Sequence, residues 1–280
     1  MYWQRTIADR IKEKIDQFSI DGAEDGFRSH LGWSVIGHDC LRYLWYHWHW
    51  FWKEQHTARM ERIFLAGHQI EAELRYILKS LGAHFLDTVD ENGQQIKVSD
   101  IGGHFGGSVD GVFIWPEIGL YLPTLLECKS SKTGAPFNDL AKKTVGGAKP
   151  RHFIQQSGYG KQLNIKYACY ICRNKNDSDL YVEIVELDWD KAQQNIEKAR
   201  YIITETTPPA RISNKPTFWV CNMCSFQDGC HRGKAPTPNC RNCVNASPVE
   251  NAEWFCKRWN SIIPKEAIIK GCSDHQFLPY

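Results

Sequence analysis

The chain has 280 residues, of which 42% are hydrophobic and 24% charged. This composition excludes wholesale disorder, because it supplies enough apolar side chains for a sizeable core. Lys and Arg number 34 against 32 Asp and Glu, so the formal net charge is +2. A near-neutral total neither indicates nor excludes nucleic-acid binding, since a basic groove can lie within it.

No stretch of the sequence approaches the roughly 18–20 uninterrupted apolar residues that a membrane helix needs. The N-terminal sequence also lacks a basic region followed by an apolar one, so we expect no signal peptide, no membrane association and a cytoplasmic protein. In that setting the eleven cysteines favour free thiols and metal ligands over disulfides.

The predicted elements change character along the chain, from helices to strands that alternate with helices, and then to a loop-rich tail. The tail, rich in Pro and Cys, has too few aliphatic residues to bury a core of its own. This order predicts an α/β (α+β) protein with an appendage. In chain order we expect a helix and a polar turn at 21–26 within 1–30, helices over 34–58, 60–81, 151–162 and 190–204, and strands over 101–115, 120–128, 167–173 and 180–187.

Two acidic residues and a lysine lie on two neighbouring predicted strands. Asp110 follows a Gly-Gly pair, which allows a close approach of a ligand or of backbone, and Glu127 and Lys129 follow a Leu-Leu run typical of a buried strand. If the two strands form a hairpin, their two-residue period places Glu127 and Lys129 on one face, Cys128 on the opposite face, and Asp110 within reach.

This grouping has the parts that phosphodiester hydrolysis needs. Two carboxylates make an oxygen site for Mg²⁺ or Mn²⁺. An adjacent ammonium group can position or deprotonate a water, or neutralise the charge that develops on the phosphate. Taken alone, Glu-x-Lys is more often an exposed pair on an ordinary strand, so the neighbouring motifs decide between the two interpretations.

The order of the motifs resembles a known family. Asp110 is followed after sixteen residues by Glu-x-Lys, a helix upstream carries Gly67-x3-Glu71, and a helix downstream carries Gln155-x3-Tyr159. This order is similar to that of the PD-(D/E)XK nuclease superfamily, and within it to the RecB-like and lambda-exonuclease-like branches.

The resemblance implies a restriction-endonuclease-like mixed sheet flanked by helices, and a role for each matching residue. Lys129 would orient or activate the attacking water, and Gln155 and Tyr159 would support the substrate or Lys129. His68 is off the register of the motif and is interpreted as a core residue or a neighbour of the ligands, with a role as a metal ligand as the alternative. The implied Mg²⁺ or Mn²⁺ ligands are Glu71, Asp110, Glu127 and the main-chain carbonyl of Cys128.

A basic cluster follows the Glu-x-Lys motif in the sequence. Such a cluster is usually a solvated loop, but beside a nuclease site it can also follow the phosphates of bound DNA, and both interpretations stay open. The cluster consists of Lys132, Lys142, Lys143, Lys149 and Arg151.

The tightest cysteine group is Cys221-x2-Cys224-x5-Cys230, which offers three thiolates and needs a fourth ligand. Together with the lone early Cys40 it resembles the iron–sulfur nucleases of the same superfamily, the AddB-type subunits and the CRISPR-associated RecB-like exonucleases. The resemblance implies that these four cysteines hold a 4Fe–4S cluster, for which cysteine-only ligation is suitable.

A second cysteine group follows in the tail. The spacing Cys221-x2-Cys224-x15-Cys240-x2-Cys243 also fits a zinc ribbon, but that pairing leaves several cysteines without a role. We therefore predict a separate zinc site, for which Cys256 and Cys272 as free thiols are the alternative. Its ligands would be Cys240, Cys243, Cys256 and Cys272, with His275 as a substitute for one of them, and Cys128, Cys169 and Cys172 would be buried strand residues.

The predicted helix over 34–58 carries Trp45, Trp48, Trp50 and Trp52. A helix that is aromatic on all sides is usually buried, and the alternative is a stacking platform for single-stranded bases. We expect most of the rings to pack in the core.

The sequence therefore predicts a Mg²⁺- or Mn²⁺-dependent DNA nuclease, most simply an exonuclease acting on DNA ends or single strands. It has an N-terminal helical segment (1–33), a RecB-like core closed by an iron–sulfur cluster (34–230) and a zinc-binding tail (231–280). By analogy it would be phage-encoded and would act in the bacterial host cytoplasm in recombination, replication or genome processing, with proteins of those processes as partners. The alternatives are a non-catalytic nucleic-acid-binding protein on a nuclease scaffold and a redox-sensing regulator.

Overall fold

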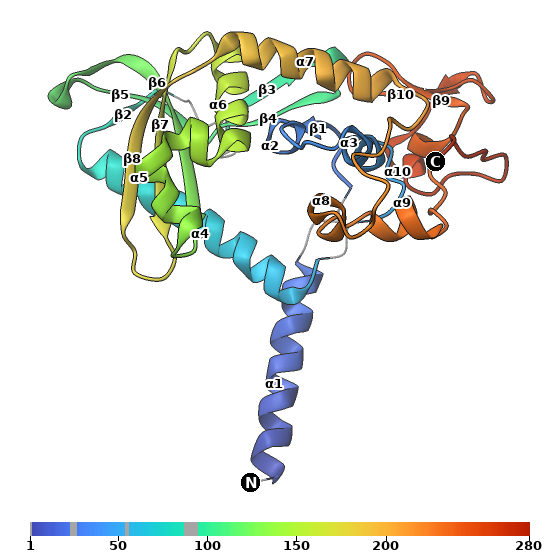
Figure 1. Ribbon diagram of the computed structural model, residues 1–280, viewed down its shortest axis with the longest axis horizontal. Helices are drawn as coiled ribbons and strands as arrows, with labels where there is room; N and C mark the ends of the chain where they lie inside the picture. Colours follow the sequence, from blue (N-terminus) through green and yellow to red (C-terminus); the bar gives the residue numbers. More distant parts are fainter. Residues whose placement is uncertain (1, 23–26, 54–55, 87–94) are drawn as a thin grey trace.

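The computed structural model describes residues 2–22, 27–53, 56–86 and 95–280. Helix α1 (Tyr2–Asp21) projects away from the rest of the molecule, and the long helix α4 (Ala58–Ser80) starts beside its C-terminal end (Figure 1). Arg62 joins the two helices through an ion pair with Asp16, 2.7 Å long. The polar turn expected at 21–26 lies largely outside the described residues. No helix in these four segments is long and apolar enough to cross a membrane.

A five-stranded mixed sheet has the strand order β2-β5-β6-β7-β8. Strand β6 pairs antiparallel with β5 and parallel with β7, while β2 and β8 form the antiparallel edges. Helix α4 covers one face of the sheet, where Leu74 packs with Leu126, Cys128, Cys169 and Ile171. The strands are β2 (His84–Phe85), β5 (Gly111–Trp115), β6 (Leu120–Ser131), β7 (Tyr167–Asn174) and β8 (Leu180–Glu186).

The opposite face of the sheet is covered by α5 (Ala135–Ala148) and α6 (Pro150–Leu163), and α6 packs in turn on α7 (Trp189–Thr204). The central strands and helices α4, α6 and α7 match the predicted elements at 120–128, 167–173, 180–187, 60–81, 151–162 and 190–204 to within a few residues. The chain is thus a mixed α/β protein, as expected, with a mixed sheet between helices.

One predicted strand, 101–115, is wrong as a single element. Its first part is a 3-10 turn (η1, Ile101–Gly103) and strand β4 (Phe105–Ser108), which belongs to a second sheet with the order β1-β4-β3. The chain leaves this sheet at Val109 and enters the main sheet at β5. Within β4, Gly106 allows the close pairing with β3, because a Cβ atom there would lie 2.2 Å from the carbonyl oxygen of Val98. Strand β1 is Leu31–Gly32 and strand β3 is Lys97–Asp100.

The predicted helix over 34–58 is also broken, into α2 (Trp33–Ile36) and α3 (Leu41–Trp48); residues 54–55 lie outside the described part. Helix α3 ends because Trp50 adopts a left-handed conformation (φ 52°) while the amide of Phe51 reaches back to the carbonyl of Tyr46. This turn folds the following aromatics back into the core.

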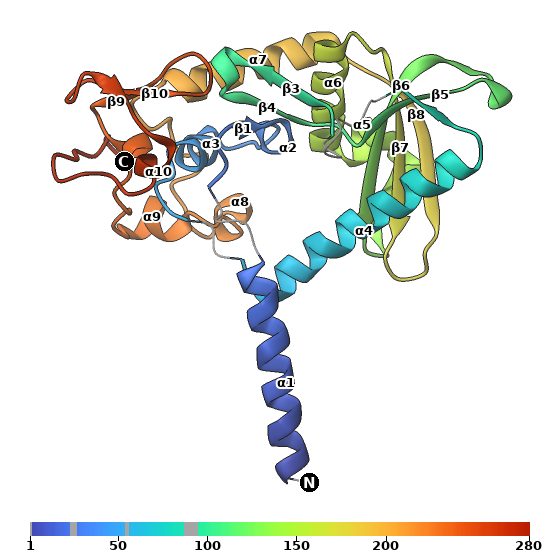
Figure 2. The ribbon, with the colours of Figure 1, turned by 180° about the vertical axis from the view of Figure 1, so that it is seen from behind.

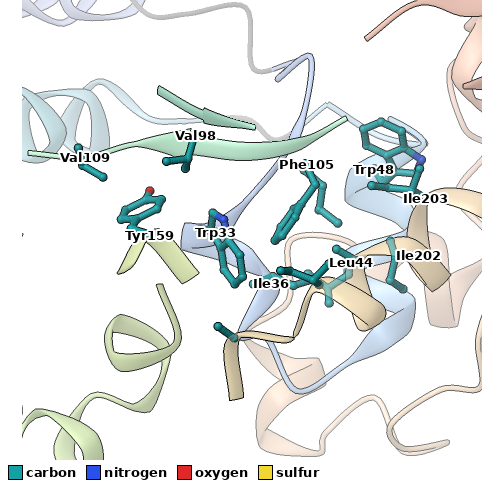
Figure 3. Close-up of a cluster of buried hydrophobic side chains, with 14 of the residues drawn as sticks. Trp33, Ile36, Leu44, Trp48, Val98, Phe105, Val109, Tyr159, Ile202 and Ile203 are labelled. Atoms are coloured by element: carbon teal, nitrogen blue, oxygen red, sulfur yellow. The ribbon is translucent and has the colours of Figure 1, made fainter. Parts of the chain in front are cut away.

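The four tryptophans are at most 8% exposed, which confirms the expectation that they pack in the core (Figure 3 shows Trp48 among its neighbours). The rings therefore form no exposed stacking platform.

The C-terminal segment lies at the side of the molecule opposite the five-stranded sheet, and α7 runs between the two (Figures 1 and 2). Arg241 connects it to the aromatic core. Its guanidinium lies 4.3 Å, 3.8 Å and 5.1 Å from the ring centres of Trp48, Trp50 and Trp254. Short elements make up the rest of this part: α8 (Trp219–Asn222), α9 (Gln227–Arg232), η3 (Cys240–Asn242), β9 (Ala246–Pro248), β10 (Trp254–Cys256), β11 (Ser261–Ile262) and α10 (Lys265–Ile268). The remaining short element, η2 (Pro116–Ile118), connects β5 to β6.

A glycine sets how closely α2 and α6 approach. A Cβ atom on Gly158 would lie 2.4 Å from ring atoms of Trp33, whereas one on Gly67 in α4 would meet nothing within 4 Å. We predict that Gly158→Ala destabilises the fold by about 2–3 kcal/mol, while Gly67→Ala stabilises it by about 0.5–1 kcal/mol. Urea denaturation of both variants measures these changes in stability. Equal changes in the two variants would contradict the close packing of Gly158 against Trp33.

Candidate functional site

The predicted carboxylate–lysine group comes together where the chain enters β5. Gly111 pairs with Leu126 of β6, which places Asp110 beside the end of the Leu-Leu run. The main-chain amide of Cys128 donates a hydrogen bond to Oδ2 of Asp110 at 2.8 Å, and Arg75 of α4 donates to the Asp110 carbonyl at 2.8 Å. Asp110 is therefore held from both β6 and α4.

Glu127 and Lys129 lie on one side of β6, as the strand period predicts. Leu126 and Cys128 point into the core beneath α4, and Glu127 and Lys129 alternate with them onto the other face. The Lys129 ammonium forms an ion pair with Oε1 of Glu127, whose side chain is 2% exposed. A buried charged pair of this kind is costly unless it is well partnered, so an accidental surface pair is excluded at this position.

Glu71 completes the group from α4. Its Oε1 accepts a hydrogen bond from Nε2 of Gln95 at 2.6 Å. His68, one turn earlier on the helix, has Nδ1 3.9 Å from Oε2 of Glu71, and its side chain is 78% exposed. His68 thus lies beside the carboxylates at the solvent side.

Burial and mutual repulsion make the carboxylates hard to ionise together. Burial, with the Asp110 charge as the second cause, raises the pKa of Glu71 to about 7. Burial raises the pKa of Glu127 to about 7 against the opposing effect of Lys129, and burial also raises the pKa of Asp110. For Lys129, burial acts to lower the pKa, but Glu127 and Asp110 outweigh it and the pKa is raised. The site is a concentration of negative charge that favours a bound cation.

Gln155 and Tyr159 lie one turn apart on α6, both buried. Nε2 of Gln155 donates to the Tyr159 hydroxyl at 3.3 Å. Figure 3 shows Tyr159 at the end of the aromatic core nearest Val109, one residue before Asp110. Gly107 makes room for the ring, because a Cβ atom there would lie 2.6 Å from the hydroxyl. Burial raises the pKa of Tyr159, so the hydroxyl is neutral.

The structure adds two residues that the motifs did not predict. Arg75 lies four residues after Glu71 on α4, so helical spacing places both on one face, and that signal could have found it. Gln95 lies in a loop ahead of β3, and nothing in its local sequence points to Glu71. Their positions depend on how the helix and the loop pack.

The residues of the basic cluster come from different elements. Lys142 and Lys143 are on α5, which is interrupted at Thr144 (φ 58°) before Lys149. Lys143 pairs with Asp139 at 3.0 Å. Arg151, in the first turn of α6, pairs with Asp39 at 3.4 Å and lies against Gly37, toward the loop that carries Cys40. Lys132 directly follows β6, next to the site strand.

Four cysteines far apart in the sequence line one pocket between α3, α8 and α9. Cys40 immediately precedes α3, and the other three lie on or between α8 and α9. The pocket has a free volume of about 20 Å³. The cysteines are Cys40, Cys221, Cys224 and Cys230, with Arg42 and Arg211 beside them.

A second pocket, of about 250 Å³, is lined by Cys240, Cys243, Cys256, Cys272 and His275. The remaining three cysteines lie buried on β6 and β7, and all eleven are free thiols. Across the described residues, no group of three or more His, Cys, Asp or Glu side chains is already arranged to hold a metal ion.

Comparison with known proteins finds likeness in structure only. No family model and no curated protein matches the chain. The alignment with the solved structure of SSO0001 covers 77% of this chain and 94% of SSO0001, at 13% sequence identity and a TM-score of 0.48. The alignment with an alkaline exonuclease (LHK-Exo) from Laribacter hongkongensis covers 68% of this chain and 90% of the exonuclease, at 14% sequence identity and a TM-score of 0.43. The structure of LHK-Exo in complex with dAMP aligns with the same coverage and TM-score, at 15% sequence identity. Likenesses this distant carry no weight in assigning an activity.

We predict a pH signature for the site. Because the pKa of Glu71 is about 7 in the fold against 4.5 for the ordinary group, its ionisation removes stability as pH rises from about 4.5 through 7. In metal-free buffer, Glu71→Gln should gain about 1 kcal/mol relative to the wild type on going from pH 5 to pH 8, a figure reduced for partial solvent screening.

Denaturation at the two pH values measures this difference. The exposed Glu266 on α10 provides the control, since Glu266→Gln should keep the same stability relative to the wild type at both. A Glu71→Gln variant that behaves like the control would show that Glu71 is not crowded by the other carboxylates.

Proposed function

We propose that the chain is a Mg²⁺- or Mn²⁺-dependent deoxyribonuclease of the PD-(D/E)XK type. The observation that carries the proposal is the buried meeting of Asp110, Glu127 and Lys129 from two paired strands with Glu71 from α4. Three carboxylates with raised pKa values and one ammonium group in one buried space are expensive to maintain. Such a cost is characteristic of a functional site.

The donor set fits a hard divalent ion. Carboxylate oxygens of Glu71, Asp110 and Glu127, with the carbonyl of Cys128, would hold Mg²⁺ or Mn²⁺, because these ions prefer oxygen ligands. A divalent ion held there supplies a Lewis acid for the phosphate and lowers the pKa of a water. The ion would also relieve the repulsion that raises the carboxylate pKa values.

Lys129 is protonated in this environment, since Glu127 and Asp110 raise its pKa above the ordinary value. A protonated amine cannot accept a proton, so its proposed role is to donate hydrogen bonds to the attacking water and to neutralise charge on the phosphate. The hydroxyl of Tyr159 accepts a hydrogen bond from Gln155 and lies near enough to Lys129 to affect its pKa. We assign Gln155 and Tyr159 the task of positioning Lys129.

The proposed substrate is DNA with an end or a single strand, cleaved as an exonuclease does. Lys132, Lys142, Lys143 and Lys149 are the proposed phosphate contacts, whereas Arg151 pairs with Asp39 on the side of the Cys40 loop. A phage origin, action in the bacterial cytoplasm and partners in recombination, replication or genome processing belong to the same proposal and rest on the motif resemblance.

We further propose a 4Fe–4S cluster on Cys40, Cys221, Cys224 and Cys230. The support is that these four cysteines line one pocket and that an all-sulfur donor set is suitable for iron–sulfur clusters. Arg42 and Arg211 line the same pocket and would offset the negative charge of the thiolates. Because Cys40 precedes α3 and the others lie near residue 225, the cluster would tie the two parts of the chain together.

The nuclease proposal predicts that Asp110→Asn and Lys129→Met each reduce Mn²⁺-dependent DNA degradation by about 100-fold or more, with DNA binding retained. End-labelled linear and circular DNA, single- and double-stranded, should be assayed with Mg²⁺, with Mn²⁺ and without metal. Asp190→Asn and Lys265→Met, exposed changes on α7 and α10, are the matched controls. If the wild type binds DNA but degrades none of these substrates, the chain is a non-catalytic binding protein.

The cluster proposal predicts about four iron atoms per chain and visible absorbance after anaerobic purification. Cys224→Ser should lose both, while Cys172→Ala, a buried change on β7, should keep them. A colourless, iron-free wild type would contradict the cluster proposal and leave the nuclease proposal unaffected.

A further inference from the structure

The C-terminal segment contains a short turn with two different faces. In the sequence Cys-Arg-Asn-Cys over 240–243, the two cysteines line the 250 Å³ pocket. The two residues between them are buried on the other side, Arg241 at 2% and Asn242 at 0% exposed. Asn239 caps the turn by accepting hydrogen bonds from the amides of Arg241 and Asn242. The turn therefore presents both sulfurs to the same space while its middle anchors in the core.

Two more sulfurs reach that space from separate elements. Cys256 ends β10, the middle strand of the three-stranded sheet β11-β10-β9, and pairs across to Ala246 and Ser261. Cys272 comes from the turn after α10 and is exposed to solvent. Cys243 also bridges to Phe277 near the C-terminus. Three independent pieces of backbone thus bring four thiols around one pocket.

The hydrogen bonds of the neighbouring polar residues limit which side chains could bind a metal ion in this pocket. His275 lines the pocket, but its Nε2 lies 2.8 Å from Oδ1 of Asn242 and 3.1 Å from the carbonyl of Asn239. That nitrogen is engaged with the capped turn. Arg258 and Asp274, which also line the pocket, form an ion pair with each other at 2.8 Å.

We propose that Cys240, Cys243, Cys256 and Cys272 form a tetrahedral zinc site that holds the C-terminal segment together. Zn²⁺ takes four thiolates in closed structural sites, with a Cys-x2-Cys turn as a frequent half of the ligand set. Within the described residues these four side chains line the pocket without meeting at a common point, so coordination requires them to rotate inward. His275 serves to hold the turn and is not a ligand.

The physical role of this site follows from what surrounds it. The segment is built from strands of two or three residues and a four-residue helix, and its own core is too small to hold such pieces in register. The turn that carries two of the ligands also carries Arg241, which stacks on Trp48, Trp50 and Trp254. Zinc would fix the turn and thereby the contact between the tail and the aromatic core.

The test uses the full-length wild type and reads metal content and thiol reactivity, so it does not depend on nuclease activity. Zinc analysis should find about one zinc per chain, separate from any iron. Because Cys272 is solvent-exposed, iodoacetamide should modify it rapidly in metal-free protein, and added Zn²⁺ should slow that modification about tenfold or more. Co²⁺ in place of zinc should give the intense visible bands of a tetrahedral thiolate site.

Paired variants locate the site. In the variant that combines Cys256→Ser with Cys272→Ser, zinc should be lost, and added Zn²⁺ should no longer slow the reaction of Cys240 and Cys243 with iodoacetamide. Cys169→Ala on β7 should keep the zinc and the slowed reaction. His275→Asn should retain zinc, which distinguishes a positioning residue from a ligand. The proposal is overturned if reconstituted wild type binds no zinc, if Cys272 reacts at the same rate with and without Zn²⁺, or if the double variant loses iron instead of zinc.

Discussion

Three carboxylates and one lysine share a buried space at the junction of β5, β6 and α4. Much of the surrounding structure supplies partners for these charges. Asp110 can remain there because the amide of Cys128 donates to its side chain and Arg75 donates to its carbonyl. Glu127 remains because Lys129 pairs with it. Raised pKa values show that these partners do not fully compensate the charge. The remaining imbalance costs stability and would be relieved by the divalent cation that we propose.

The second organising feature is the aromatic core. Trp48 and Trp254, from segments about 200 residues apart, pack with ring centres 5.5 Å apart, and Arg241 lies over both. A buried guanidinium without a carboxylate partner is unusual. Here three main-chain carbonyls, those of Arg28, Ser29 and Trp48, accept its hydrogen bonds. The early and late parts of the chain are thus interleaved, which also explains how Cys40 can lie beside cysteines near residue 225.

Local sequence patterns predicted the long elements well. Helices α4, α6 and α7 and strands β6 to β8 were predictable because their apolar periodicity continues over many residues. The failures fall where tertiary contacts overrule local preference. Strand 101–115 splits between two sheets at Val109 and Asp110, and the aromatic helix ends just before Trp50, a residue with no intrinsic preference for the left-handed conformation that it adopts. Neither break carries a local signal, because each is stabilised by packing against residues distant in the chain.

The sequence by itself determined which residues are candidates: the acidic pair with its lysine, the helix carrying Glu71, and eight cysteines that the family resemblance divides into two sets of four. Only the tertiary structure decided how they combine. It brought Arg75 and Gln95 to the carboxylates, turned Arg151 toward the Cys40 loop, and gave His275 hydrogen-bond partners in the capped turn. Spacing along a chain constrains only neighbours within one element, whereas charge, burial and hydrogen bonding depend on elements that meet through folding.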